Sequence, residues 1–154
     1  MTLDIVLDVD GTLDDFHGDV TPKLCKDLAA KGARLWMLSK REEGLLKEQA
    51  ISSKYGLTPI IVVQGDNYVH TKVGSLKTWM QEVPQKEKVV YVGDRAEDFM
   101  IAWFCNCIYC SPSALSLEIF DEVKYSIGIM CGGQNGKKAF FRVNLVKPSL
   151  GAIL

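Results

Sequence analysis

The sequence predicts an α/β fold built on a doubly wound parallel sheet of five strands, with helices on both faces. Short runs of apolar and β-branched residues alternate with helical patterns over the first 120 residues. No repeat, low-complexity tract or linker interrupts this alternation. Strands that alternate with helices pair in parallel, because each helix returns the chain to the start of the next strand. We therefore expect one Rossmann-like domain over residues 1–154, with its core in residues 1–120 and a C-terminal extension in residues 121–154.

The first predicted strand, Leu3–Leu7, is apolar except for Asp4 and ends in the segment Asp8-Val9-Asp10-Gly11-Thr12-Leu13. Alternate side chains of a strand share a face, so Asp8 and Asp10 start on the same side, and Gly11 permits a sharp turn just after them. Paired carboxylates at this end of a parallel strand are typical of a ligand or metal site, although Asp-Gly is also a common turn. Asp4 is expected to be an edge or surface acid.

The next elements are delimited by capping residues. Thr21 is a typical helix cap, Pro22–Lys31 is predicted as the helix that follows it, and Gly32 is placed to end that helix. Ala33–Leu38 is predicted as the second strand, with Ser39 directly after it. The later predicted elements are a helix at Glu42–Tyr55, a strand at Pro59–Val63, a helix capped by Thr71 and ending near Glu82, a strand at Lys88–Val92, a helix at Arg95–Phe104, a strand at Asn106–Cys110 and a helix at Pro112–Phe120.

The C-terminal extension is predicted to form a β-hairpin. Tyr125–Met130 and Ala139–Val146 flank the Gly-rich segment Gly132–Gly136. The sequence leaves open whether this hairpin extends the sheet, mediates oligomer formation or shields a site. The apolar tail, Leu150–Leu154, is expected to pack on its own domain or on a partner.

Composition narrows the class of protein. The chain has 154 residues, of which 47% are hydrophobic and 24% charged, with a formal net charge of -1, so no globally basic surface favours non-specific nucleic-acid binding. No stretch approaches the roughly 18 consecutive apolar residues of a membrane span, and the first ten residues lack the basic flank of a signal peptide. We expect a soluble, cytoplasmic protein that has no membrane partner.

Three of the five cysteines, Cys105, Cys107 and Cys110, lie in one apolar segment. A zinc site is the functional alternative for this cluster of cysteines. The paired spacing of zinc knuckles is absent, however, and no histidine lies nearby in the sequence. We therefore expect buried, reduced thiols.

Polar residues at the ends of several predicted strands are expected to meet at one rim of the sheet, because the carboxyl ends of parallel strands share an edge. Taken singly, a serine here is more often a helix cap and a lysine more often a solvated charge. Their order along the chain favours a joint site. The candidates are Asp8 and Asp10 after the first strand, Ser39 after the second, Lys72 at the start of the third helix, and Asp94 and Asp98 after the fourth strand.

In this order the chain resembles the haloacid dehalogenase (HAD) superfamily of phosphohydrolases over roughly residues 1–120. The four matching motifs are Asp8-Val9-Asp10-Gly11-Thr12, Ser39 after Leu35-Trp36-Met37-Leu38, Lys72, and Gly93-Asp94-Arg95-Ala96-Glu97-Asp98. Lys54 is a weaker competitor for the lysine. The haloalkanoate dehalogenases of the superfamily lack an aspartate at the position of Asp10, so the resemblance implies a phosphoryl substrate. Response-regulator receivers fit poorly, because Asp66 after the third strand has no paired acid.

The resemblance implies a mechanism in which Asp8 attacks phosphorus to form an aspartyl-phosphate and Asp10 acts first as general acid and then as general base. It implies a Mg²⁺ ion held by Asp8, the backbone carbonyl of Asp10 and Asp94, with Asp98 orienting the metal waters or Lys72. Three further contacts to the phosphoryl oxygens are expected, from the Ser39 hydroxyl, the Lys72 ammonium, and a small anion-binding nest of the Gly11 and Thr12 amides.

The substrate stays open. The two places where a cap could enter, Leu13–Val20 and Gln64–His70, are short, so a capless enzyme is expected, and capless members tend to act on large substrates or to oligomerise. One element of polynucleotide kinase-phosphatases is similar to the segment Ser39-Lys40-Arg41-Glu42. A nucleic-acid 3′-end phosphatase is therefore an alternative function, in which Arg41 would contact a substrate phosphate. An idle binding module is the third hypothesis. Further residues near the expected mouth are Asp14, Asp15, Phe16, His17, Asn67, Tyr68 and His70.

Overall fold

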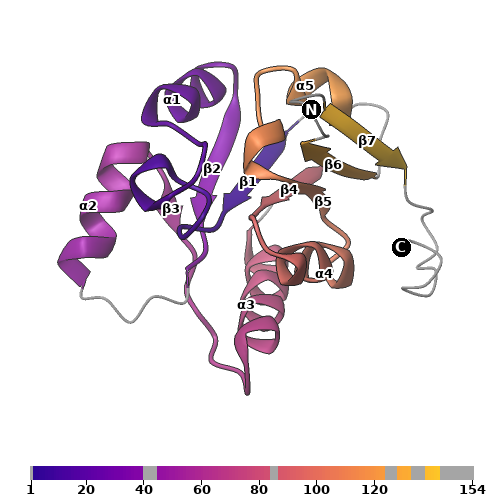
Figure 1. Ribbon diagram of the computed structural model, residues 1–154. Helices are drawn as coiled ribbons and strands as arrows, with labels where there is room; N and C mark the ends of the chain where they lie inside the picture. The colour runs from indigo at the N-terminus through magenta and orange to yellow at the C-terminus, as the bar shows by residue number, and fades with distance from the viewer. Residues whose placement is uncertain (1, 40–44, 84–86, 124–127, 133–137, 143–154) are drawn as a thin grey trace.

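The computed structural model describes residues 2–39, 45–83, 87–123, 128–132 and 138–142, and these residues form an α/β fold (Figure 1). The strands are β1 Leu3–Leu7, β2 Ala33–Met37, β3 Thr58–Pro59, β4 Lys88–Val92, β5 Ile108–Cys110, β6 Gly128–Gly132 and β7 Lys138–Arg142. The α-helices are α1 Pro22–Ala30, α2 Leu45–Tyr55, α3 Tyr68–Glu82, α4 Ala96–Phe104 and α5 Ile119–Glu122, with short 3-10 turns at Asp14–Phe16 and Pro112–Ala114.

The strands form one sheet in the order β3-β2-β1-β4-β5-β6-β7. The first five are parallel, which confirms the doubly wound fold expected from the sequence. Strand β1 lies at the centre, with Leu7 opposite both Met37 of β2 and Val92 of β4. The chain winds outward from β1 in one direction and then returns to its other side at β4. The carboxyl ends of β1 and β4 therefore flank the switch point where open α/β sheets bind ligands.

Two hydrophobic layers cover the sheet, one on each face. Ile5 and Leu7 of β1 pack in a cluster that includes residues of α1, α2 and α5, such as Leu28, Tyr55 and Ile119. Val6 of β1 packs in a second cluster with residues of α3 and α4, such as Leu76, Trp79 and Ile101. Alternate residues of β1 thus face opposite helical layers, and all five are buried.

The third strand is shorter than expected. It was predicted at Pro59–Val63, but only Thr58 and Pro59 pair with β2. The Ile60 amide still donates to the Met37 carbonyl at 2.8 Å, whereas the Val63 amide donates to the Ser75 hydroxyl of α3 at 2.7 Å. Ile61 is 82% exposed. The apolar run therefore leaves the sheet edge and becomes the connection to α3.

Helix α3 begins earlier than expected, because Asn67 and not Thr71 caps it. The Asn67 side chain accepts a hydrogen bond from the His70 amide at 2.9 Å. Thr71 is a buried residue within the helix, where its hydroxyl accepts from the Gly65 amide at 3.0 Å. The predicted helix at Pro112–Phe120 is also different, since the structure has a 3-10 turn at Pro112–Ala114 and the four-residue α5.

The predicted C-terminal hairpin is confirmed, with shifted ends. Strands β6 and β7 are antiparallel, with Gly128 opposite Arg142 and Gly132 opposite Lys138, and β6 runs parallel to β5. The hairpin therefore extends the sheet. The predicted apolar tail, Leu150–Leu154, lies outside the described residues.

The sequence predicted Asp4 as an edge or surface acid, and this prediction is wrong. Asp4 is fully buried in the central strand. Its two carboxylate oxygens accept hydrogen bonds from Arg34 Nε at 2.7 Å and Arg34 Nη2 at 2.8 Å, and the Trp36 indole donates to the same group at 2.9 Å. The adjacent strand thus supplies all three donors. This bidentate pair explains how a charge is tolerated in an apolar strand.

Replacement of Arg34 by Leu is expected to destabilise the fold by roughly 3 kcal/mol, because it leaves the Asp4 carboxylate buried without its ion-pair partner. Urea unfolding at neutral pH measures the change. The control is Lys23→Leu, which removes an exposed pair with Asp27 and should change the free energy of unfolding little, because solvent screens such a pair. Equal, small effects of both substitutions would contradict the role given to Arg34 as the partner of the buried Asp4.

Cys25, Cys105, Cys107 and Cys110 form no disulfide among the described residues, and Cys25, Cys105 and Cys110 are buried, as expected. Cys107 is half-buried. Burial, with the nearby charge of Asp14, raises the pKa of the Cys25 thiol to about 12. Across the described ranges, no helix has both the length and the apolar character needed to cross a membrane.

Candidate functional site

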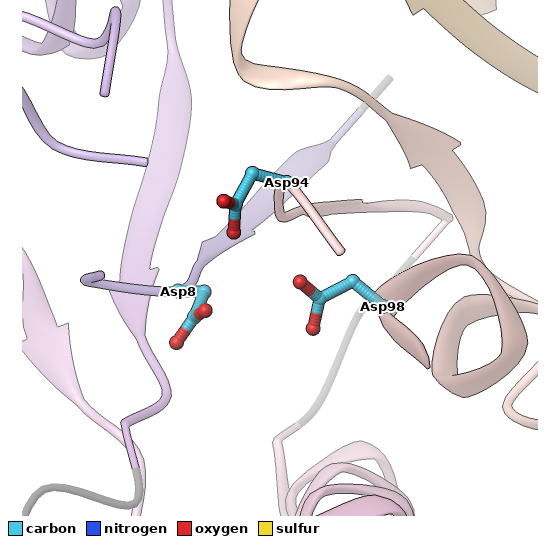
Figure 2. Close-up of side chains that lie close together, drawn as sticks. All are labelled: Asp8, Asp94 and Asp98. Carbon is cyan, nitrogen blue, oxygen red and sulfur yellow. The ribbon is translucent and has the colours of Figure 1, made fainter. Parts of the chain in front are cut away.

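Three carboxylates meet at the switch point of the sheet. Asp8 follows β1, Asp94 follows β4, and Asp98 lies in the first turn of α4. Each contributes one oxygen to a group in which all three oxygens lie within 4.8 Å of one another. Figure 2 shows the three side chains directed toward a common space. Adjacent parallel strands bring Asp8 and Asp94 to the same edge, and the helix returns Asp98 to it, as the sequence predicts.

Two glycines leave room for these acids. A Cβ atom at Gly11 would lie 2.0 Å from Asp94 Oδ2, and Gly11 has a φ of 73°, which side chains rarely adopt. A Cβ atom at Gly93 would lie 2.4 Å from Asp98 Cγ. The Asp94 side chain therefore lies against the backbone of Gly11, and the Asp98 side chain against that of Gly93, in space that a side chain at either glycine would fill.

Replacement of Gly11 by Ala is expected to displace Asp94 and to destabilise the fold by roughly 1–3 kcal/mol, through steric overlap and an unfavourable φ. Denaturant unfolding gives the magnitude. Gly74→Ala is the matched control, because a Cβ atom there meets nothing within 4 Å and the helix favours alanine. Gly11→Ala behaving like Gly74→Ala would show that the close approach is not required.

Lys72 is the cation of this site. It is 1% exposed, and its Nζ donates to Asp8 Oδ1 at 2.9 Å and to the backbone carbonyl of Leu38. The ammonium therefore holds one oxygen of Asp8 in place and balances part of the negative charge of the three acids. Lys54, the competing lysine, pairs instead with Asp15, so of these two lysines it is Lys72 that contacts the acids.

Two tyrosines surround Asp98, and the sequence interpretation did not give either a role at the acids. Asp98 Oδ1 accepts from the Tyr68 hydroxyl at 2.9 Å and from the Tyr91 hydroxyl at 3.2 Å, while Oδ2 accepts from the Arg95 amide at 3.0 Å. The Tyr68 hydroxyl also lies 3.4 Å from Asp8 Oδ2. Tyr68 precedes Lys72 by one helical turn, so both residues face the same side of α3. This spacing is the sequence signal that could have predicted Tyr68 as a site residue.

Burial and the charge of Asp8 raise the pKa of Asp98, while hydrogen bonds from Arg95 and Tyr68 and the charge of Lys72 oppose this effect. Burial, followed by the charges of Asp8 and Asp98, raises the pKa of the Tyr68 hydroxyl. Burial raises the pKa of Tyr91 in the same way. Both phenols therefore keep their protons and act as hydrogen-bond donors at neutral pH.

A cavity of about 620 Å³ opens onto the acids. Asp10 is exposed and lines this cavity with Ser39, but its carboxylate is not part of the three-acid group. His17 and Phe16 also line the cavity, whereas His70 does not. The complete lining is Asp8, Asp10, Gly11, Phe16, His17, Ser39, Tyr68, Asp94 and Arg95.

The expected anion nest at Gly11 and Thr12 is not available in this structure. The Gly11 amide donates to the Phe16 carbonyl at 2.7 Å, and the Thr12 amide donates to the Val9 carbonyl at 3.1 Å. Both amides are used to close the turn after β1. Thr12 is fully buried, so its side chain does not face the cavity, while Gly11 serves the site by admitting Asp94.

Asp14 and Asp15 hold the loop after β1 against α2 and do not line the cavity. The Tyr55 hydroxyl donates to Asp14, the Asp15 amide donates to the Tyr55 oxygen at 3.1 Å, and Lys54 pairs with Asp15. Asn67 is occupied as a helix cap. Arg41 lies outside the described residues.

The three acids fit a divalent cation. They supply hard oxygen ligands within 4.8 Å of one another, and one buried ammonium, that of Lys72, contacts Asp8. Mg²⁺ would relieve the repulsion that contributes to the raised pKa of Asp98. No other group of at least three metal-ligating side chains lies together in the part of the chain that the structure describes.

Comparisons of the chain with protein-family models, with curated proteins and with solved structures find no match. The functional interpretation therefore depends on the geometry of the site and on the order of its residues in the sequence.

Proposed function

We propose that this protein is a Mg²⁺-dependent phosphomonoesterase of the HAD type that forms an aspartyl-phosphate on Asp8. The observation that carries the proposal is the buried Lys72–Asp8 contact, 2.9 Å long, beside Asp94 and Asp98 at the switch point of the sheet. An isolated buried acid would be paired and structural, as Asp4 is. Asp8 instead lies beside two further acids as well as its cation, and it opens onto a cavity.

In the first step, an oxygen of Asp8 attacks phosphorus while the bond from phosphorus to the leaving oxygen breaks. Lys72 holds Asp8 Oδ1 and Tyr68 lies near Oδ2, so the nucleophile is oriented before substrate binds. Asp10, exposed in the cavity wall, gives its proton to the leaving oxygen. Ser39, in the same wall, offers a hydroxyl to a phosphoryl oxygen.

In the second step, Asp10 takes a proton from water as that water attacks the aspartyl-phosphate. The new bond joins the water oxygen to phosphorus, the bond from phosphorus to Asp8 breaks, and inorganic phosphate leaves. Asp8 returns to its carboxylate form beside Lys72, and Asp10 is again protonated for the next cycle. Lys72 holds and balances Asp8 in both steps, because its ammonium gives up no proton in either step.

Asp8, Asp94 and the backbone carbonyl of Asp10 would hold Mg²⁺, which when bound reduces the repulsion between the Asp8 carboxylate and the phosphate dianion. Asp98 is assigned an orienting role. Each of its oxygens already accepts a hydrogen bond from the protein, from Tyr68 and Tyr91 at one oxygen and from Arg95 at the other.

A nucleic-acid end phosphatase of the same chemistry is the second candidate. Phe16 and Tyr68 both line the cavity, and aromatic rings of this kind stack on bases. The short connections on either side of the site, residues 8–21 and 60–67, favour a capless enzyme whose substrate covers the site itself.

Phosphate release from a panel of substrates tests the proposal, with Mg²⁺ and with a chelator. The panel holds an aryl phosphate, sugar phosphates, nucleotides and 3′-phosphorylated oligonucleotides. Turnover that requires Mg²⁺ is expected, and competition between the oligonucleotides and the aryl phosphate separates the two candidates. Folded, Mg²⁺-loaded protein that releases phosphate from no member of the panel would favour the binding-module hypothesis.

A further inference from the structure

Arg95 places a second cation at the cavity, at a different position from Lys72. It follows Asp94 directly, is exposed, and lines the cavity wall. Its guanidinium carbon lies 5.0 Å from the centre of the Tyr68 ring. A cation over an aromatic face is attracted to the ring, so Tyr68 steadies the Arg95 side chain.

The charge of Arg95 is not neutralised by an ion pair with any carboxylate of the described residues. The other described cations near buried or clustered acids are paired: Lys72 with Asp8, Lys54 with Asp15, and Arg34 with Asp4. Arg95 contacts the Tyr68 side chain instead, and a guanidinium has five N–H donors, more than one phenol can engage, so donors remain for an oxyanion.

Arg95 and the acids contact different parts of Tyr68. The guanidinium lies over the Tyr68 ring, whereas the Tyr68 hydroxyl reaches Asp98 and Asp8. The scissile phosphoryl group must meet Asp8, where Lys72 already supplies a cation. Arg95 lines the same cavity, so it can contact a part of the substrate other than the phosphoryl group at Asp8.

We propose that Arg95, steadied by the Tyr68 ring, binds a second anionic group of the substrate, a carboxylate or a further phosphate, beside the phosphoryl group that is removed. This inference rests on the proposed phosphatase function and narrows its substrate class to molecules with two anionic groups. The guanidinium fork binds carboxylate and phosphate oxygens in the same two-point manner.

Matched substrate pairs test the inference. One pair is glycerol 3-phosphate and 3-phosphoglycerate, which differ in a carboxylate. The other is a nucleoside 3′-phosphate and the nucleoside 3′,5′-bisphosphate, which differ in a 5′-phosphate. In the wild type, kcat/KM is expected to be about tenfold or more higher for the member with the additional anion of at least one pair, as a charge-assisted contact allows. The pair that shows the preference identifies the anion.

Arg95→Gln is expected to bring that preference ratio close to one, mainly through KM, because it removes the charge and the fork. Lys31→Gln is the matched control, since Lys31 is also a cation over an aromatic ring, Phe120, but does not line the cavity. The control should keep the wild-type ratio. A ratio that survives in Arg95→Gln, or a wild type without any preference, would overturn the inference while the phosphatase function stands.

Failure of the proposed function gives a different result. In that case neither member of any pair releases phosphate with wild-type protein, and calorimetry of the same ligands with wild type and Arg95→Gln decides the role of Arg95. Weaker binding to the variant of the members that carry the additional anionic group supports an anion site. Equal affinities overturn it.

Discussion

Replacement of Asp8 by Asn is expected to reduce phosphate release at least about a thousandfold, because an amide cannot form the acyl-phosphate bond. Asn has nearly the shape of Asp, and its oxygen can still accept from Lys72 Nζ, which lies 2.9 Å from Asp8 Oδ1. The fold should therefore persist. Steady-state phosphate release with Mg²⁺ measures the loss, and circular dichroism on heating shows whether the variant is folded.

The matched control is Asp15→Asn, which changes an acid in the same loop that pairs with Lys54 and lies outside the cavity. It should retain most of the activity. Acid-quenched wild type should carry phosphate on the peptide that contains Asp8, and the Asp8→Asn variant should carry none. Substantial turnover by the folded variant would exclude Asp8 as the nucleophile.

Replacement of Lys72 by Met is expected to give the largest loss of stability among these variants, about 3–5 kcal/mol at neutral pH without metal. Lys72 is 1% exposed, and its removal leaves Asp8 and Asp98 buried close together without a cation. Urea unfolding gives the change. The double variant Asp8→Asn/Lys72→Met should recover a large part of it, because the buried charge that Lys72 balanced is then absent.

The pH dependence of this loss follows from Asp98. Its pKa is already raised by burial and by Asp8, and Lys72 acts to lower it, so the variant raises it further. A carboxyl group with a raised pKa stabilises the fold fully below its unfolded pKa, and this contribution is lost as pH rises through the folded pKa. The destabilisation of Lys72→Met should therefore be smaller near pH 5 than near pH 8.

Lys54→Met is the control for this experiment, since the Lys54–Asp15 pair is half-exposed and should contribute little to the free energy of unfolding. A Lys72→Met variant as stable as Lys54→Met at pH 8 would show that the acids do not depend on the buried ammonium.

The fold could be predicted because its signals are local. Apolar runs end in polar residues where strands end, and the acids after β1 and β4 need no knowledge of distant partners to be placed on one edge. Lys72 was found through the order of the residues. Its burial was not predictable from sequence, because a lysine within a helix is usually solvated.

The interpretation was incomplete or wrong where a side chain depends on a remote partner. Asp4 is buried because Arg34, thirty residues later, covers it with two hydrogen bonds. The hydroxyl of Tyr68 reaches Asp8, sixty residues earlier in the chain. Thr71 was predicted as the cap of α3, but the cap is Asn67, which accepts from the His70 amide, and residue type alone does not distinguish the two.

The short strand β3 has a consequence for the behaviour of the protein at high concentration. It is the last strand on its side of the sheet, where a strand from another molecule would otherwise attach through backbone hydrogen bonds. Only Thr58 and Pro59 pair there, and proline has no amide hydrogen to offer. This edge is therefore a poor template for strand addition, and it protects the protein from growing into fibrillar aggregates on that side.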